Sequence, residues 1–119
     1  MSNKVIAAQN APAALGPYSH AVLAGTTLDI SGQLGLDPAT GALAASVTEQ
    51  AEQGLKNLGA ILQAAGMDYG DVVKTTVFLA DMGDFAAVNE VYARFFTSNF
   101  PARSCVQVAA LPKLSLIHI

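Results

Sequence analysis

The stretch "DVVKTTVFLADMGDFAAVNEVYARFF", residues 71–96, predicts a strand that leads directly into a helix. Residues 71–80 are rich in Val and Thr, which favour a pleated, half-buried surface. From residue 85 to residue 96 the large apolar side chains recur at steps of three and four, as they do on one face of an α-helix. A strand joined to an amphipathic helix indicates a sheet with that helix packed on it.

The segments on either side extend this pattern. Residues 46–66 predict a longer helix, in which Ser46 and Glu49 fit a capping box and Gly66 fits a left-handed C-terminal stop. Residues 102–110 predict a further strand. Together these segments give two amphipathic helices, each of which needs a sheet face to cover.

The N-terminal third predicts strands rather than helices. Short strand-like runs cover residues 4–7, 19–24 and 26–31, and the last two are joined near Gly25 as a tight hairpin. The order is therefore β-β-β-α-β-α-β, which indicates an α+β fold with both helices on one side of the sheet. The other sheet face is left bare in a single chain, and this favours an oligomer.

The composition of the chain indicates how many domains it has and which kinds of partner it is unsuited to. A chain of 119 residues is one domain by size, and its 13% charged and 52% hydrophobic residues leave apolar surface for a subunit interface. No apolar run approaches the ~18 residues that span a membrane. The net charge of −3 and the lack of a Lys/Arg cluster argue against nucleic acid. One cysteine, Cys105, cannot form an internal disulfide, so we expect a cytoplasmic protein.

Arg103 and Cys105 point to the same side of the strand over residues 102–110. Arg103 is either an ordinary surface or ion-paired arginine, or its planar fork faces a carboxylate and donates two parallel hydrogen bonds. Cys105 is either a small buried side chain or a thiol activated by the nearby cation. A cysteine nucleophile normally needs a histidine base, and His20 is distant in sequence.

Four further positions are candidates for binding a ligand. Tyr18 lies in a Gly-Pro loop, and Ser31 with the Gly32 backbone ends a strand, although both positions also suit ordinary turns. Asn89 lies near the apolar face of its helix, where its amide either ties down a loop or contacts substrate. No metal-ligand spacing, P-loop or dinucleotide fingerprint occurs, so we expect no metal and no cofactor.

Five segments resemble the RidA/YjgF family of enamine/imine deaminases. They are "GPYSHA" (16–21), "ISGQLGLDPATGAL" (30–43), "EQAEQGLKNLGAILQAAG" (49–66), "VVKTTVFLADMGDFAAVNEVYARFF" (72–96) and "PARSCVQVAALPK" (101–113). The resemblance runs in order over nearly all of residues 1–113, and its last block is the most specific. It implies a chorismate-mutase-like fold and a homotrimer with a central β-barrel and three ligand clefts between subunits.

The resemblance also implies an activity without a cofactor. Members hydrolyse 2-imino acids, such as 2-iminopropanoate and 2-iminobutanoate, to 2-keto acids and ammonia, and so remove by-products of pyridoxal-phosphate enzymes. By motif, Arg103 matches the arginine that grips the substrate carboxylate, and Cys105 matches a position lining the cleft. Tyr18, Ser31 and Gly32 match other cleft positions, and Asn89 matches a neighbouring helix position. At His20 many members carry Gln.

The end of the chain departs from the resemblance. After Lys113 the family continues with a strand that carries a glutamate for water and proton transfer, whereas this chain has "LSLIHI", residues 114–119, with no acidic residue. We therefore expect a RidA-like domain over residues 1–113 and a non-native tail in place of the final strand, or a tail that begins a substitute strand. In both cases we expect impaired activity, because losing one proton-transfer group costs about 10²–10⁴-fold.

Two other function classes remain open at this stage. A non-catalytic trimer that binds small 2-keto or imino acids would use the same cleft. The RNA cleavage attributed to some family members is the third class, and the negative net charge argues against it.

Overall fold

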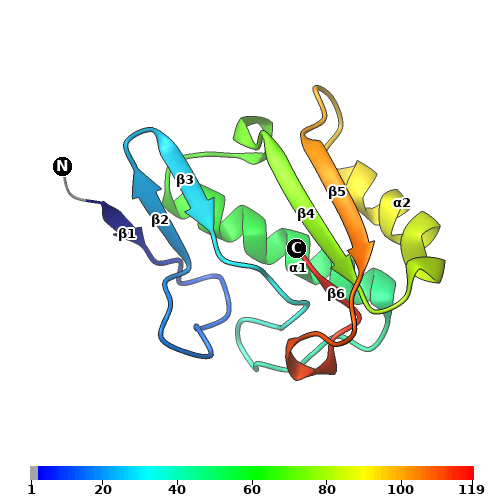
Figure 1. The fold of residues 1–119 in the computed structure, drawn as a ribbon. Coiled ribbons are helices and arrows are strands. Elements are labelled where there is room, and N and C mark those ends of the chain that lie inside the picture. The colour runs from blue at the N-terminus through cyan, green and yellow to red at the C-terminus, as the bar shows by residue number, and fades with distance from the viewer. Residues whose placement is uncertain (1–2) are drawn as a thin grey trace.

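Two small sheets and two helices form the protein, whose computed structural model describes residues 3–119 (Figure 1). Within this range the first sheet has the antiparallel order β1-β2-β3, and the second has the order β5-β4-β6. The sequence predicted one sheet, and the structure divides it into two. The strands are β1 Lys4–Ile6, β2 Ala21–Ala24, β3 Thr27–Ile30, β4 Lys74–Leu79, β5 Ala102–Gln107 and β6 Ile117–His118.

The β2–β3 hairpin confirms the predicted turn at Gly25, whose φ of 62° favours glycine. In β3 the side chains of Leu28 and Ile30 are half-buried, whereas Thr27 and Asp29 are exposed. This alternation places the apolar face of β3 toward the core.

Helix α1, Val47–Ala64, confirms the first predicted helix. The Ser46 hydroxyl accepts a hydrogen bond from the backbone N–H of Glu49, while the Glu49 carboxylate accepts one from that hydroxyl. At the other end Gly66 adopts a φ of 74° and stops the helix. The apolar stripe of α1 therefore begins and ends where its capping residues stand.

Strand β4 begins later than the sequence predicted. The carboxylate of Asp68 accepts from the backbone N–H of Gly70, and that of Asp71 accepts from the backbone N–H of Asp68. These two bonds fold residues Tyr69–Asp71 into a short 3-10 turn, so β4 starts at Lys74 instead of residue 71. The predicted strand over residues 102–110 is also too long, because β5 ends at Gln107.

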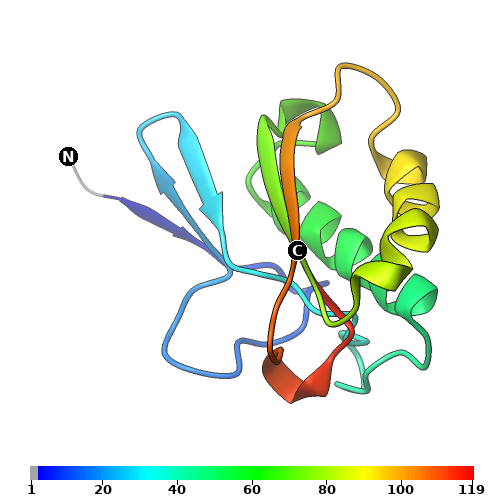
Figure 2. The same ribbon diagram turned by 45° about the vertical axis from the view of Figure 1, so that its right-hand side comes forward.

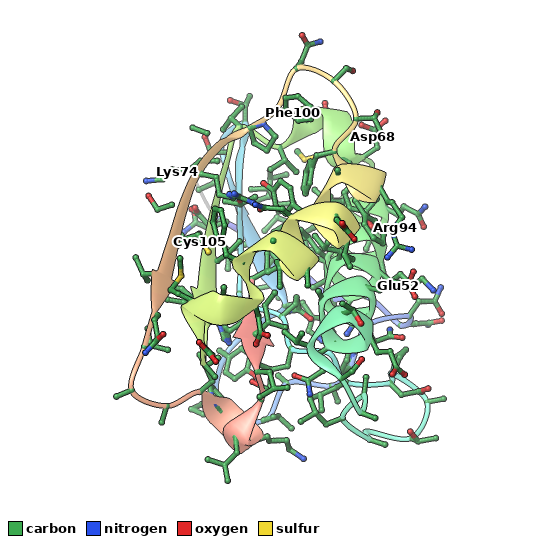
Figure 3. The ribbon with its side chains drawn as sticks, turned by 90° about the vertical axis from the view of Figure 1, so that its right-hand side faces the viewer. Glu52, Asp68, Lys74, Arg94, Phe100 and Cys105 are labelled. Carbon is green, nitrogen blue, oxygen red and sulfur yellow. The ribbon has the colours of Figure 1, made fainter. Side chains whose placement is uncertain are left out.

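Helix α2, Phe85–Phe95, confirms the second predicted helix and connects the parallel strands β4 and β5. Both helices lie on the same side of the strands, as predicted (Figure 2). Arg94 of α2 donates to the Glu52 carboxylate of α1 at 3.2 Å, so an exposed ion pair ties the two helices together (Figure 3).

Residues 114–119 are part of this fold. After a short 3-10 turn at Pro112–Leu114, β6 pairs antiparallel with β4, and Ile117 is buried against the core. The buried Gln50 side chain holds this segment, because it accepts from the backbone N–H of Leu116 and donates to the carbonyl of Ala44. Two residues of this segment, Ile117 and His118, are thus in a strand.

The sheet face away from the helices carries apolar side chains that are open to solvent. Val106 of β5, which points to the opposite side of the strand from Arg103 and Cys105, is 44% exposed. Within residues 3–119 neither helix is long and apolar enough to cross a lipid bilayer. The oligomer that the sequence predicted from a bare sheet face stays a prediction.

Candidate functional site

Arg103 lies against the aromatic rings of α2. Strand β5 places it opposite Thr75 of β4, on the face that α2 covers. Its guanidinium carbon is 4.8 Å from the centre of the Tyr92 ring and 5.5 Å from that of Phe85, within the range of cation–π attraction. Within residues 3–119 Arg103 forms no ion pair with a carboxylate. Its fork of N–H donors is therefore held by rings and available to an anion from outside.

Tyr92 is itself fixed in position. Its hydroxyl lies 2.7 Å from the Thr75 hydroxyl, and both side chains are buried. Its ring centre is 4.6 Å from that of Phe96. The helical pattern of residues 85–96 predicts Phe85 and Tyr92 only as apolar helix positions and not their contact with Arg103. The available signal was two aromatic residues two turns apart on the helix that precedes the arginine's strand.

Cys105 is half-buried and packs against the core beside the helices (Figure 3). Burial raises the pKa of its thiol, and the charge of Arg103 opposes this only in part. The thiol is therefore protonated at neutral pH, which argues against the activated nucleophile that one sequence alternative allowed.

Asn89 is half-buried on α2, between the positions of Phe85 and Tyr92. Residues four apart and three apart share a helix face, so Asn89 lies on the side whose rings contact Arg103. The structure thus gathers Arg103, Cys105 and Asn89 around the surface between β5 and α2.

Ser31 and Tyr18 belong to a second group, at the end of β3. The Ser31 backbone N–H donates to the carbonyl of His20, and its hydroxyl donates to the carbonyl of Ser19 at 2.7 Å. The Tyr18 hydroxyl accepts from the backbone N–H of Leu15, and the side chain is 48% exposed. Ser31 therefore fastens β3 to the loop that presents Tyr18.

The His20 ring forms hydrogen bonds with two backbone groups, a role that the sequence did not predict. Its Nδ1 accepts from the backbone N–H of Ala8 at 3.0 Å, and its Nε2 donates to the carbonyl of Pro12 at 2.7 Å. This pattern requires the neutral ring with the proton on Nε2. A glutamine amide offers the same acceptor and donor, which explains chemically why either residue suits this position.

Gly32 lies directly against the imidazole of His118. A Cβ atom at Gly32 would collide with that ring, so the position excludes every other residue unless His118 moves. Burial lowers the pKa of His118, and its Nδ1 has no hydrogen-bond partner among the described residues. No acidic residue follows Lys113 in the sequence, and the titratable side chain that reaches Gly32 is this histidine.

The two groups of candidate residues are separate within one chain. Ser31 and Gly32 line a cavity of about 880 Å³ between β3 and β4, and Tyr18 lines a smaller one beside it. Arg103, Cys105 and Asn89 line neither cavity. Strands β3 and β5 stand on opposite sides of β4 (Figure 1).

Within residues 3–119 there is no cluster of His, Cys, Asp or Glu arranged to hold a metal ion.

Comparison with known proteins gives a consistent assignment. The sequence profile of the family described as Endoribonuclease L-PSP matches residues 8–119. A human protein named 2-iminobutanoate/2-iminopropanoate deaminase is 58% identical over 117 residues, which cover 98% of this chain and 85% of the human protein. The structure of the YjgF gene product from E. coli is 52% identical, with a TM-score of 0.93 over 97% of this chain and 93% of that one.

The structure of E. coli TdcF with bound serine is 47% identical, with a TM-score of 0.93 over 97% of this chain and 93% of that one. The family profile, the human relative and both structures each match nearly the whole of this chain. The chain belongs to the RidA/YjgF family.

Proposed function

We propose that this chain is a subunit of an enamine/imine deaminase, which hydrolyses 2-imino acids such as 2-iminopropanoate and 2-iminobutanoate to 2-keto acids and ammonia. The observation that carries the proposal is Arg103, whose guanidinium is held against Tyr92 and has no carboxylate partner among residues 3–119. The name of the human relative supports the reaction class.

Arg103 binds the substrate carboxylate in this proposal. A guanidinium meets a carboxylate through two parallel N–H···O bonds, which fix both the position and the plane of the acid. Because the Tyr92 and Phe85 rings hold the guanidinium from one side, little side-chain entropy is lost when substrate arrives. The serine held by the TdcF relative is a small molecule with the same carboxylate.

Once the imino acid is oriented, its hydrolysis requires only a water molecule and proton transfers. Water adds to the C=N carbon of the protonated imine, a proton passes to nitrogen, and the C–N bond breaks to release ammonia and leave a C=O group. Cys105 contributes as a neutral lining group, because burial raises the pKa of its thiol. The Ser31 hydroxyl donates to the Ser19 carbonyl and so remains able to accept from substrate or water.

A homotrimer with clefts between subunits completes the site in this proposal. Within one chain Tyr18, Ser31 and Gly32 lie apart from Arg103, Cys105 and Asn89. An interface that sets β3 of one subunit beside β5 of the next brings the two groups together. The exposed side chains of Val73 and Val106 supply apolar area for such an interface.

A non-catalytic trimer that binds 2-keto or imino acids is the second candidate. The serine bound to the TdcF relative favours it, since binding alone needs only Arg103 and the cleft. It would act as a sensor of small acids rather than remove them.

One assay separates these candidates. Release of 2-ketobutanoate and ammonia is followed from 2-iminobutanoate generated in situ, with a chelator present and buffer hydrolysis subtracted. The deaminase predicts acceleration by the wild type, loss in Arg103→Ala and retention in Arg94→Ala, which removes an exposed arginine from α2. Background rates in the wild type, with calorimetric 2-ketobutanoate binding that Arg103→Ala abolishes, would establish the binding protein.

The same samples test the remaining expectations. RNA cleavage that persists in Arg103→Ala would instead support the third function class. The expected rate deficit is measured by comparing this chain with the human relative under the same conditions. Cytoplasmic location stays a prediction, for which fractionation of the source cells is the measurement.

A further inference from the structure

The loop between β1 and β2, residues 7–20, is held to the rest of the protein by few contacts. All of its residues from 13 to 18 are exposed, and Tyr18 is one of them. At its start Ala8 and Ala11 are buried in the apolar cluster that contains Ile61. The part of the loop that carries Tyr18 therefore has no buried side chain of its own to hold it in place.

One imidazole ring supplies the hydrogen bonds that fasten this loop. Within residues 3–119, the bonds that join residues 8–18 to other parts of the chain are those of His20, to the backbone N–H of Ala8 and to the carbonyl of Pro12. The other described bonds of residues 8–18 connect them only with each other. The fastened loop requires the neutral ring, because Nδ1 accepts while Nε2 donates.

A proton on Nδ1 is incompatible with this arrangement. In the imidazolium ion both nitrogens are donors, so an N–H of the ring would face the N–H of Ala8 and neither could accept from the other. Ala8 is buried, and its N–H would be left without a partner unless the ring and the backbone move apart. The proton and the fastened loop therefore compete for the same lone pair of His20.

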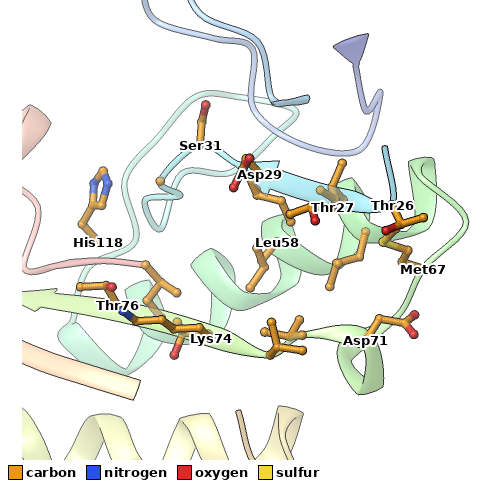
Figure 4. Close-up of a pocket in the computed structure, with 18 of the residues that line it drawn as sticks. Thr26, Thr27, Asp29, Ser31, Leu58, Met67, Asp71, Lys74, Thr76 and His118 are labelled. Atoms are coloured by element: carbon orange, nitrogen blue, oxygen red, sulfur yellow. The ribbon is translucent and has the colours of Figure 1, made fainter. Parts of the chain in front are cut away.

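No charged side chain near the ring is placed to change this competition. Strands β1 and β3 carry one charged residue each, Lys4 and Asp29, and both are exposed and away from the end of β2 that follows His20. Asp29 and the second histidine, His118, line the large cavity between β3 and β4 (Figure 4). In the small cavity beside the ring the other titratable side chain is that of Tyr18.

The remaining surroundings of the ring are apolar. Helix α1 contributes Ala60, Ile61 and Ala65 to the cluster beneath the loop. Within residues 3–119 no ion pair includes His20. A proton on this ring therefore gains no carboxylate partner while the loop is fastened.

We propose that His20 is a positioning residue that makes the loop carrying Tyr18 sensitive to pH. The loop is fastened when the ring is neutral and released when the ring is protonated. Because the released loop takes up a proton that the fastened loop does not, the released fraction rises as the pH falls. Histidine changes its charge between pH 5 and 8, so acidification within this range drives the release. One consequence, weaker binding of the imino acid at acid pH, rests on the proposed function.

The test is NMR spectroscopy of the full chain, labelled with ¹⁵N, between pH 7.5 and 5. At pH 7.5 the ring nitrogens of His20 should show the neutral form with its proton on Nε2. The Ala8 amide should lose roughly tenfold of its protection against hydrogen exchange at pH 5, after correction for the intrinsic effect of pH on exchange. The Ser31 amide, which donates to the backbone carbonyl of His20, should keep its protection.

Two variants at the same position are the matched controls. In His20→Gln the amide can accept from Ala8 and donate to Pro12 but takes up no proton, so the Ala8 amide should stay protected down to pH 5. His20→Ala lacks both bonds, so the Ala8 amide should exchange readily even at pH 7.5. Because His118 is present in all three proteins, differences between them belong to residue 20.

Three results would overturn the inference. They are protection of the Ala8 amide that does not change with pH, an equal loss of protection in His20→Gln, and a neutral ring with its proton on Nδ1. The consequence for substrate is checked by the KM for 2-iminobutanoate, which should rise between pH 7.5 and 5.5 more in the wild type than in His20→Gln. Equal changes would refute that consequence.

The outcome for the loop is independent of the outcome for the reaction. A chain without deaminase activity whose Ala8 amide responds to pH as expected would refute the proposed function and support the inference. An active chain whose Ala8 amide does not respond would refute the inference alone.

Discussion

The hydroxyl groups of Thr75 and Tyr92 lie 2.7 Å apart in the core, and the guanidinium of Arg103 rests on the ring of the same tyrosine. One side chain thus links the interior of the protein to the candidate carboxylate-binding group. We therefore expect stability to depend on the Tyr92 hydroxyl and binding of a carboxylate to depend on its ring.

Tyr92→Phe removes the hydroxyl and keeps the ring. Thr75 is then left buried without its partner, which costs about 1–3 kcal/mol of the free energy of unfolding. Arg103 keeps its aromatic contact, so the KM for 2-iminobutanoate should stay near that of the wild type. Urea denaturation and steady-state kinetics measure the two effects. Adding Thr75→Val should recover part of the lost stability, and no recovery would contradict the assignment of the cost to an unpaired hydroxyl.

Arg103→Lys keeps the charge but loses the planar fork. A hydrogen bond to a charged group contributes about 1.5–3 kcal/mol, so we expect kcat/KM to fall roughly 10- to 100-fold. Arg94→Lys on the exposed face of α2 is the matched control and should leave kcat/KM unchanged. A lysine variant as active as the wild type would show that a point charge is enough.

The variants His20→Gln and His20→Ala distinguish the two backbone hydrogen bonds of His20 from any other role of its imidazole ring. Glutamine can accept from Ala8 and donate to Pro12, whereas alanine leaves both backbone groups without a partner. Alanine should therefore lower the free energy of unfolding by about 1–2 kcal/mol and raise KM, because the loop that carries Tyr18 loosens. Glutamine should restore both quantities. Equal damage by both variants would mean that the imidazole has a role beyond these two hydrogen bonds.

Asn57→Ala tests the buried amide of α1. Asn57 is 0% exposed, and its amide donates to the carbonyls of Leu34 and Leu36 at 3.0 and 2.9 Å. Removing it leaves two buried carbonyls unpaired and should cost about 2–4 kcal/mol of unfolding free energy. The comparison is Gln53→Ala, whose half-buried side chain donates to Asn57, with a smaller loss of about 1–2 kcal/mol because one buried acceptor loses its donor instead of two. Equal losses in the two variants would contradict this account.

The half-buried His118 should make stability depend on pH. Burial lowers its pKa in the folded chain, so below about pH 6.5 the unfolded chain binds more protons than the folded one. The free energy of unfolding should therefore fall as the pH falls through this range. His118→Gln should flatten the dependence, as measured by urea denaturation between pH 5 and 8. Parallel curves for the two proteins would assign the effect to other groups.

The helices were predictable because their signals are local. Ser46, Glu49 and Gly66 mark the ends of α1 within the sequence itself, and the structure places caps there. The start of β4 was not predictable from propensity, because Val72 and Val73 read as strand residues. The carboxylates of Asp68 and Asp71 outcompete that preference by closing a 3-10 turn.

The candidate site could be predicted from the sequence in part. A lone arginine in an apolar strand already singled out Arg103. Its contact with Tyr92 depends on how α2 crosses over β5, which no local pattern contains. The direction in which the Cys105 pKa is shifted could not be predicted from the sequence either. The charge of Arg103 lowers this pKa and burial raises it, and the packing of the folded chain determines which effect is larger.

Helix α1 is shared by two separate groups of buried side chains. Ile61 packs with the β1–β3 sheet, whereas Leu55, Leu58 and Leu62 pack with β4, α2 and β6. Between the sheets, the described backbone bonds join Gln33 to Ile119. Leu28 and Ile30 of β3 contact both groups, so the side chains of one strand connect them. We expect amide protons of β2 and β3 to exchange with solvent faster than those of α1 and β4, because fewer buried side chains hold the β1–β3 sheet.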